Sequence, residues 1–271
     1  MSVLEDCMRE DLNARAERRI AVLEPLRLVI DNYPEGATEE CLAPNHPQQP
    51  ELGRRAVPFN RELWIERDDF ALEPPKGYFR LAPGAEVRLR YAYIVRCTSV
   101  DRDADGKVIA VHCTYDPATR SGTPGADARK VKGNIHWLSV PHAQSAEVRL
   151  YDRLFSVPFP GAATAPQAEE VADRTAVSVP APLDAPAVLA GDDTEEVSAP
   201  VERSYLHDLN PGSKRVITAY VEPALAGAAP EERFQFERHG YFVADARDHR
   251  AGAAVFNRTV TLRDSWGKSG A

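Results

Sequence analysis

The 271-residue sequence has no apolar run near the roughly 20 residues that a membrane-spanning helix needs. Its start, MSVLEDCMREDLNARAERR, lacks the basic-then-apolar order of a secretory signal. We therefore expect no membrane association and, by default, a cytoplasmic location. The hydrophobic content of 43% and the charged content of 27% are ordinary for a globular protein with one large or two small domains.

Cysteine is scarce, and the sequence contains no C-x-x-C pair and no histidine at zinc-ligand spacing from a cysteine. The four scattered cysteines are expected to be reduced thiols: Cys7, Cys41, Cys97 and Cys113. His136 and His142 are six residues apart, a weak metal pattern that polar residues near strand ends explain equally well. No metal site is predicted.

Sequence motifs of nucleotide-binding and hydrolytic enzymes are missing as well. There is no G-x-x-x-x-G-K-[ST], no G-x-S-x-G and no H-E-x-x-H. The acidic pairs Asp68/Asp69 and Glu39/Glu40 fall in polar turns, where adjacent carboxylates are usually solvated, so they are weak candidates for a general acid and base. No catalytic residue is predicted.

The net charge of −8 is unevenly distributed along the chain. Residues 160–205 hold nine acids and two bases, which leaves 32 acids against 31 bases elsewhere. The remainder is nearly neutral and can carry local basic patches, so global acidity does not exclude a phosphate-rich partner.

Most of the chain shows the pattern of an all-β protein. Residues 3–22 predict a helix, because Leu4, Met8 and Leu12 recur at helical spacing. The proline-rich residues 37–56 predict a loop. Short β-type runs follow, with an Asp105-Gly106 hairpin signal among them: ELWIER, GYFRL, EVRLRYAYIVRCTSV, VIAVHCTY, KVKGNIHWLSV and AEVRLYDRLF.

Composition divides the chain into four segments. Alanine, proline and acids dominate residues 158–204, which predicts a flexible insertion because such a composition buries little apolar surface. β-type runs then return in KRVITAYVE, RFQFERHGYFVAD and AVFNRTVTLRDSW. We expect a helix over 1–22, a first β-barrel region over 23–157, the insertion over 158–204, and a second β-barrel region over 205–271.

Arginines and aromatic residues in these runs are typical of a nucleic-acid surface. Alternation in EVRLRYAYIV places Arg88 and Arg90 on one strand face and four apolar or aromatic residues on the other: Val87, Leu89, Tyr91 and Tyr93. Side chains two residues apart on a strand are roughly 7 Å apart, which suits neighbouring phosphates or bases. A solvated strand face explains the same pattern.

Two further places mix aromatic and polar side chains. Tyr78, Phe79 and Arg80 are consecutive, and Gln235 and Arg238 lie among aromatic residues in RFQFERHGYF. Single-stranded RNA is bound by such mixtures, because unstacked bases stack on rings while arginine contacts phosphates or base edges. Aromatic residues of a β core explain these places too.

Eight strings, in this order, resemble the anticodon-binding region of bacterial glutaminyl-tRNA synthetases: NYPEG, NHPQQPELGRRAVPF, ELWIERDDF, YFRLAPGAEVRLRYAYIV, RKVKGNIHW, EVRLYDRLFSVPFPG, RFQFERHGYF and VFNRTVTLRDSW. The resemblance covers nearly the whole chain except about 160–204. It is closer to the bacterial enzymes than to the archaeal-type glutamyl-tRNA synthetases.

The resemblance implies two barrels of the ribosomal-protein-L25-like type, duplicated with exchanged amino-terminal strands. Residues 1–22 would be the last helix of a preceding connecting region. HIGH-type and KMSKS-type signatures, which hold ATP in the family, are absent. We therefore expect a truncated part without cofactors that is inactive alone, while its parent would be a glutamine–tRNA ligase using ATP and magnesium.

The resemblance also assigns residues to the first two anticodon bases. Arg88 and Arg90 fall at positions near the first base, and Arg18, Gln235 and Arg238 fall at positions that bind the central uridine. Alternation alone would put Gln235 and Arg238 on opposite strand faces. Their joint use therefore requires the strand to bend or end near Glu237, and Gly240 favours such a bend.

Three more assignments complete the expected site. Arg80 falls at the position that reads the third base, a guanine, and Asn13 and Arg263 fall at further tRNA-facing positions. Well-known bacterial members have a glutamine and a lysine where this chain has Gly77 and Phe79. Arg80 is then the main candidate at the third base.

These observations favour a monomer that binds the anticodon stem-loop of glutamine tRNA and not DNA. The alternative is a generic β-barrel module for protein or carbohydrate interaction without tRNA binding. The two hypotheses differ in salt dependence, because contacts with RNA phosphates weaken as salt rises.

Overall fold

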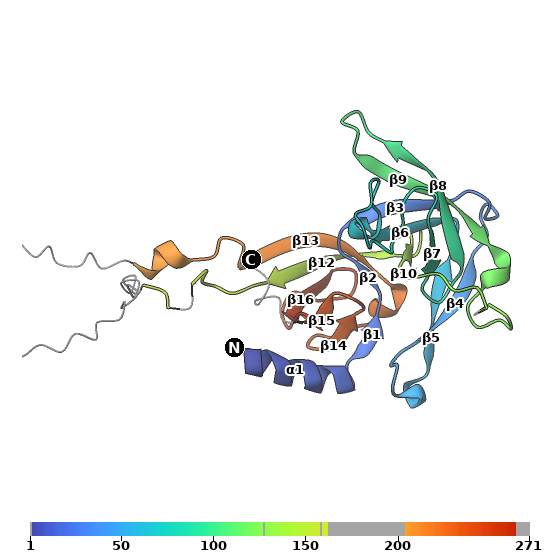
Figure 1. Ribbon diagram of the computed structural model, residues 1–271. Coiled ribbons are helices and arrows are strands. Elements are labelled where there is room, and N and C mark those ends of the chain that lie inside the picture. Colours follow the sequence, from blue (N-terminus) through green and yellow to red (C-terminus); the bar gives the residue numbers. More distant parts are fainter. Residues whose placement is uncertain (1, 127, 158, 162–203, 264–271) are drawn as a thin grey trace, which may run out of the picture. The chain divides into compact units, whose positions relative to one another are not determined.

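The computed structural model describes residues 2–126, 128–157, 159–161 and 204–263 (Figure 1). The chain forms two compact units, one of residues 1–151 with 214–271 and one of residues 152–213. The insertion expected at 158–204 lies almost entirely outside the described residues, so its predicted flexibility stays a prediction. Among the described helices, none combines the length and the apolar character that crossing a membrane requires.

The larger unit contains one helix and two barrel-like sheets, which confirms the expected all-β architecture. The first sheet has the strand order β10-β7-β8-β9-β3-β6-β11. Its strands are β3 (Pro25–Ile30), β6 (Glu62–Glu66), β7 (Glu86–Leu89), β8 (Ile94–Arg102), β9 (Val108–Asp116), β10 (Gly133–Ile135) and β11 (Leu138–Ser139).

The second sheet has the order β1-β14-β15-β16-β12-β13-β2. Its strands are β1 (Glu17–Arg19), β2 (Ala21–Val22), β12 (Gln144–Tyr151), β13 (Lys214–Val221), β14 (Arg233–Phe236), β15 (Gly240–Ala244) and β16 (Ala254–Val260). Five 3-10 helices join the strands: η1 (Pro50–Leu52), η2 (Arg67–Asp69), η3 (Pro117–Thr119), η4 (Tyr205–Asp208) and η5 (Pro223–Leu225).

The chain passes between the two sheets twice. Strands β1 and β2 belong to the second sheet, whereas β3 belongs to the first, so the chain crosses over at Leu23–Glu24. It returns after β11, because β12 pairs with β13 and β16. Residues 144–151 thus lie in the same sheet as the strands of the second expected barrel region. Strand β3, by contrast, pairs with β6 and β9, which follow it in the sequence.

The amino-terminal helix α1 (Ser2–Arg15) is shorter than the expected 3–22. Residues 17–19 instead pair in parallel with β14, and residues 21–22 pair with β13. Strand pairing thus replaces helical hydrogen bonds after residue 16. The helix packs on the second sheet, where Leu12 and Ala16 are buried with Tyr241 and Val260.

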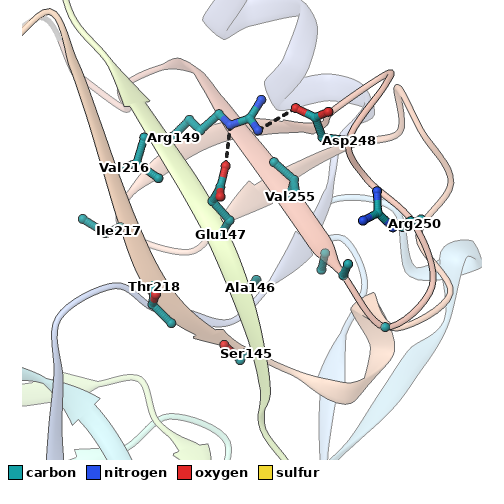
Figure 2. Close-up of a pocket in the computed structure, with 13 residues that line it drawn as sticks. Ser145, Ala146, Glu147, Arg149, Val216, Ile217, Thr218, Asp248, Arg250 and Val255 are labelled. Atoms are coloured by element: carbon teal, nitrogen blue, oxygen red, sulfur yellow. Dashed lines mark hydrogen bonds and ion pairs between the residues drawn. The ribbon is translucent and has the colours of Figure 1, made fainter.

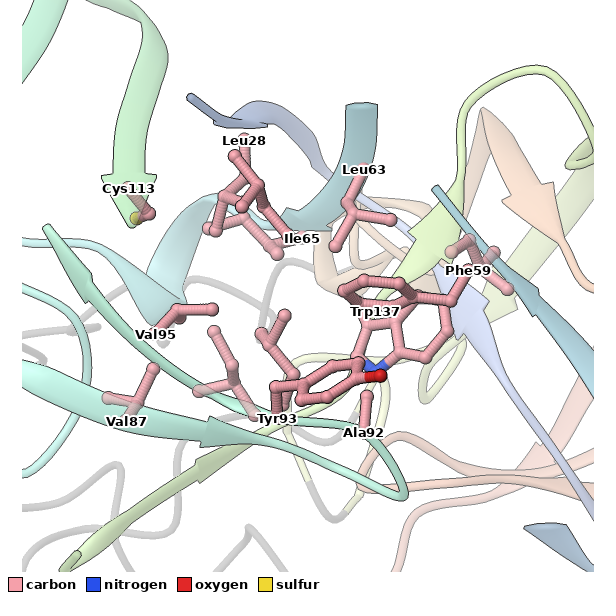
Figure 3. Packing of buried hydrophobic residues seen from close by; sticks show 14 of the residues in the cluster. Leu28, Phe59, Leu63, Ile65, Val87, Ala92, Tyr93, Val95, Cys113 and Trp137 are labelled. Atoms are coloured by element: carbon pink, nitrogen blue, oxygen red, sulfur yellow. The ribbon is translucent and has the colours of Figure 1, made fainter. Parts of the chain in front are cut away.

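Alternation in the first sheet follows the sequence pattern. Val87 and Leu89 are fully buried, whereas Arg88 and Arg90 are partly exposed, as predicted. The core beneath them includes Trp137, whose ring meets that of Phe59 edge-on at 4.9 Å between centroids (Figure 3). Aromatic pairs of this geometry add to the free energy gained from burial. The indole Nε1 donates to the carbonyl oxygen of Arg90 (2.9 Å), which ties the core to the end of β7.

The hairpin predicted at Asp105-Gly106 is present between β8 and β9, with Gly106 at a φ of +79° (Figure 1). The loop predicted over 37–56 is wrong in part, because β4 (Glu39–Pro44) and β5 (Arg54–Phe59) pair there as a separate sheet. Cys41 and Ala43, two positions apart on β4, are buried in the core of the first sheet. The prolines around β4 masked this strand-like alternation in the sequence. The run at 77–81 forms no strand, only a bridge from Leu81 to Phe70.

Candidate nucleic-acid interface

The turn between β14 and β15 brings together most of the predicted site residues. Strand β14 ends at Phe236, and Arg238 has a φ of +72°. Gly240 also has a positive φ, and a Cβ at this position would lie 2.5 Å from the carbonyl oxygen of Val260. Only glycine can lie this close to the backbone of Val260. The chain therefore bends after β14, as the joint use of Gln235 and Arg238 requires.

Two arginines from distant parts of the chain meet at one buried carboxylate. Asp69 ends η2 with no exposed surface, and its two oxygens accept from Nη1 and Nη2 of Arg238 at 2.5 and 2.6 Å. Nη1 of Arg80 lies 3.3 Å from Oδ1 of Asp69 and donates to the carbonyl oxygen of Asp68 at 3.0 Å. The Arg80 side chain is 43% exposed and that of Arg238 is 26% exposed. Both guanidinium groups are thus oriented by protein and open to solvent.

Glu237, the neighbour of Arg238, orients a third arginine. Its carboxylate lies 3.0 Å from Nε of Arg90 and accepts from the hydroxyl of Tyr91 at 3.1 Å. Arg55 approaches the same carboxylate at 3.9 Å. Burial, with Glu237 beside it, raises the pKa of Tyr91 to about 12, so the phenol remains a donor at neutral pH. Arg90 is 39% exposed, and its guanidinium carbon lies 5.2 Å from the ring centroid of Tyr91.

Arg18 lies one strand away from this turn. It pairs in register with Gln235, because β1 runs parallel to β14. Its Nη2 donates to Oδ1 of Asn13 (2.7 Å), and its Nη1 donates to the carbonyl oxygen of Ala16 (2.6 Å). Burial lowers the pKa of this guanidinium from its ordinary value, and only 7% of the residue is exposed. Arg18 and Asn13 therefore form a prearranged pair behind Gln235.

The last two predicted residues are placed differently. Arg88 is held by an ordered loop, since it donates to the carbonyl oxygens of Thr119 (2.8 Å) and Ala126 (3.0 Å). Arg263 is exposed at the end of the described chain, after β16. Its carbonyl accepts from the hydroxyl of Thr261 (2.7 Å), but no contact joins its side chain to the β14–β15 turn within the described residues.

Two family models match the chain, at residues 16–116 and at residues 134–186 with 189–245. Both describe the anticodon-binding domain of class I tRNA synthetases for glutamate and glutamine (E and Q). The chain belongs to this family. Anticodon-binding domains of this family bind tRNA.

Glutamine–tRNA ligases from several bacteria are similar to this anticodon-binding chain. The ligase of Cupriavidus metallidurans is 57% identical over 268 residues, which is 99% of this chain and 40% of the ligase. Those of Nitrosomonas europaea and Xanthomonas euvesicatoria are 53% and 51% identical. The chain spans about 40% of the length of these relatives, and the part that it matches is their anticodon-binding region.

A second cluster adjoins Arg238 in the β14–β15 turn. Glu66, His136 and His239 bring ligand atoms within 4.8 Å of one another. However, Nη1 of Arg238 lies 3.3 Å from Nδ1 of His136, so this nitrogen accepts and the proton belongs on Nε2. A metal at Nε2 needs the opposite tautomer, so the cluster fits hydrogen bonding better. Glu66 also accepts from the backbone N–H groups of Leu23 (2.6 Å) and Glu24 (3.0 Å), where the chain crosses between sheets.

This cluster predicts a loss of stability on acidification. Burial lowers the pKa of His136 below its ordinary 6.5, so below that pH the unfolded chain binds a proton that the folded chain does not. Neutral His136 therefore contributes stability that is present above pH 6.5 and decreases as the pH falls below that value. His112 acts in the opposite sense, because the hydrogen bonds that its ring donates to the carboxylates of Asp31 and Asp101 raise its pKa. Urea denaturation of the parent and of His136→Gln, above and below pH 6.5, isolates the His136 contribution. An equal change of unfolding free energy with pH in the two proteins would contradict it.

No sequence pattern identified the residues that orient the arginines. Asp69 was expected to be solvated in a turn, but it is completely buried. Glu39, expected in a turn as well, lies on β4 and accepts from the hydroxyls of Tyr33 (3.0 Å) and Tyr93 (2.8 Å). Acidic partners of Arg238 and Arg80 could not be identified, because Asp69 and Arg238 are 169 positions apart.

A cavity of 700 Å³ lies over β12, β13 and β16 (Figure 2). One of its two arginines, Arg149, donates hydrogen bonds to Glu147 and Asp248, both at 2.6 Å. None of the predicted RNA-contacting residues lines this cavity.

Proposed function

We propose that this chain binds the anticodon stem-loop of a glutamine tRNA, as a monomer and in the cytoplasm. The observation that supports this most is the convergence of Arg80, Arg90 and Arg238 on two buried carboxylates at one turn. Ion pairs with Asp69 and Glu237 restrict these side chains before RNA arrives. Less side-chain entropy is then lost on binding.

Each anticodon base has its own group of residues in this proposal. Arg80 reads the third base, a guanine, whose O6 and N7 accept from a guanidinium. Gln235 and Arg238, supported from behind by Arg18 and Asn13, bind the central uridine. Arg88 and Arg90 bind the first base. Arg263 contributes a further contact with the tRNA.

A cavity beside Tyr91 is suited to the first base. It has a volume of 530 Å³ and is lined by Tyr91, Arg54, Arg120 and Ser121 among others. The hydroxyl of Ser121 lies 3.3 Å from Nη1 of Arg88, which connects this cavity to the predicted first-base residues. A phenol and two guanidinium groups suit a base with its phosphates.

The whole protein, in this proposal, is an ATP-dependent glutamine–tRNA ligase. ATP and magnesium would be used outside these 271 residues, which would need no cofactor and have no ligase activity alone. This portion would contribute selection of the tRNA through bases that are splayed out of the loop.

Filter binding of two RNA hairpins tests the proposal. One hairpin carries a glutamine anticodon, and the other is the same stem with an unrelated anticodon. We expect tighter binding of the first, and an affinity for both that falls as salt is raised from 50 to about 200 mM. A generic protein- or carbohydrate-binding module predicts no salt-dependent binding of either hairpin, and that result would refute the proposal.

A further inference from the structure

We propose that Phe79, with Lys132 above its ring, is a stacking site for one unpaired base of the anticodon loop, next to the base that Arg80 reads. This inference rests on the proposed function and adds a residue pair to it. Stacking on an exposed ring tolerates any base, so the pair would contribute affinity and position the neighbouring base rather than select a sequence.

The backbone around Phe79 is held so that its ring faces solvent. On one side, the hydroxyl of Tyr78 donates to the carbonyl oxygen of Asp68 at 3.0 Å. On the other side, Nη1 of Arg80 donates to the same oxygen, also at 3.0 Å. Phe79 lies between these two anchored residues and is 54% exposed. Its exposure is thus built into the loop.

A second segment fixes the cation above the ring. Gly133 begins β10, and a Cβ there would lie 2.3 Å from the carbonyl oxygen of Phe79 and 2.7 Å from Cγ1 of Val87. Only glycine permits this approach, which holds the preceding Lys132 over Phe79. The Lys132 ammonium lies 4.8 Å from the ring centroid, within the range of a cation–π interaction.

The charges around the ring favour RNA as its partner. The two segments that form the site, residues 76–80 and 128–132, contain no acidic residue. They contain exposed Lys76 and Lys130 beside the pair itself. An aromatic ring among cations provides the two contacts that single-stranded RNA needs, a platform for a base and a charge for a phosphate. Arg80 places this platform directly beside the proposed third-base contact.

Binding of the glutamine-anticodon hairpin to variants of the 271-residue chain tests this inference. We expect Phe79→Ala to weaken binding about tenfold and Phe79→Leu to weaken it less, because leucine keeps apolar area without a ring face. Lys132→Gln should lower the slope of log K against log salt by roughly 0.7, the value for one phosphate contact on a single strand.

Hairpins with a single abasic nucleotide at each loop position identify the stacked base. At one position next to the third anticodon base, Phe79→Ala should cause no further loss, since the base that it stacks on is already missing. A constant loss at all positions would show that the ring contacts no particular base and would overturn the inference.

Two matched variants on the β8–β9 hairpin serve as controls. Ile109→Ala removes another exposed apolar side chain (49% exposed), and Lys107→Gln removes another lysine. Neither should change affinity more than about twofold. If Phe79→Ala binds like Ile109→Ala while Arg80→Ala is weakened, only the stacking site is wrong. If the parent chain shows no preference for the hairpin, the proposed function itself fails.

Discussion

Replacing Arg238 with alanine should lower the free energy of unfolding by about 3 kcal/mol. The substitution leaves the carboxylate of Asp69 without its bidentate partner at a position with no exposed surface. Removing one partner of a buried ion pair costs about 3–5 kcal/mol. The lower end of this range applies because Nη1 of Arg80 remains 3.3 Å from Oδ1 of Asp69. Urea denaturation followed by circular dichroism measures the change.

A double-mutant cycle separates the buried charge from simple loss of a side chain. Asp69→Asn combined with Arg238→Ala should be less destabilised than the sum of the two single variants, because no unpaired charge is left. Arg27→Ala is the matched control, since Arg27 pairs with Glu62 at 2.5 Å on the surface. That exposed pair should contribute at most about 1 kcal/mol. A similar loss for Arg27→Ala and Arg238→Ala would mean that burial of Asp69 does not matter.

Arg238→Ala should also bind RNA poorly, independently of its lower stability. In the proposed function, Arg238 contacts the central uridine, so Arg238→Ala should reduce discrimination against a hairpin with that base changed. The double variant with Asp69→Asn regains stability but not the guanidinium. Its affinity should therefore stay low while its unfolding midpoint recovers, which distinguishes a binding role from a folding role.

Local features of this chain could be predicted from its sequence. Alternation over residues 86–90 predicted that Arg88 and Arg90 lie outside the core, where both are partly exposed, and Asp105-Gly106 marked a hairpin. Both depend on neighbours within a few residues, where side-chain period and turn geometry determine the outcome. A bend near Glu237 was a condition for the site; Arg238 has a φ of +72° there, and only glycine at position 240 avoids a clash with the carbonyl oxygen of Val260.

Long-range features were not predictable in the same way. Residues 17–22 continue a helical pattern but pair with strands more than 190 positions later, so tertiary pairing overrides local preference. The acidic pair Asp68/Asp69 has the composition of a solvated turn, but Asp69 is buried because the β14–β15 turn covers it with Arg238. Nothing in a single sequence indicates which acid will meet which arginine.

Buried acids within a site for an anionic ligand have a physical explanation. Arginine side chains carry considerable rotamer entropy, and a carboxylate behind each guanidinium removes part of it in advance. Asp69 and Glu237 lie behind their arginines with 0% and 3% exposure, so they are shielded from an incoming phosphate. Each arginine still has donors to spare, because a guanidinium carries five N–H groups.

Replacing Arg80 with alanine should weaken binding of the glutamine-anticodon hairpin by ~1–3 kcal/mol and relax discrimination at the third base. Its stability should change little, because Arg80 is largely exposed and Asp69 keeps the bidentate partner Arg238. Binding of four hairpins that differ only at the third base measures both effects.

Arg96→Ala is the control for Arg80→Ala, because exposed Arg96 also donates to a carbonyl oxygen, that of Gly84 at 3.3 Å. General loss of positive charge would weaken all four hairpins equally in both variants. Base reading by Arg80 would instead weaken mainly the hairpin with guanine at the third position, since a guanidinium fork matches the O6 and N7 of that base. Unchanged affinity and unchanged base preference in Arg80→Ala would remove Arg80 from the site and leave the ion pair with Asp69 as its only role.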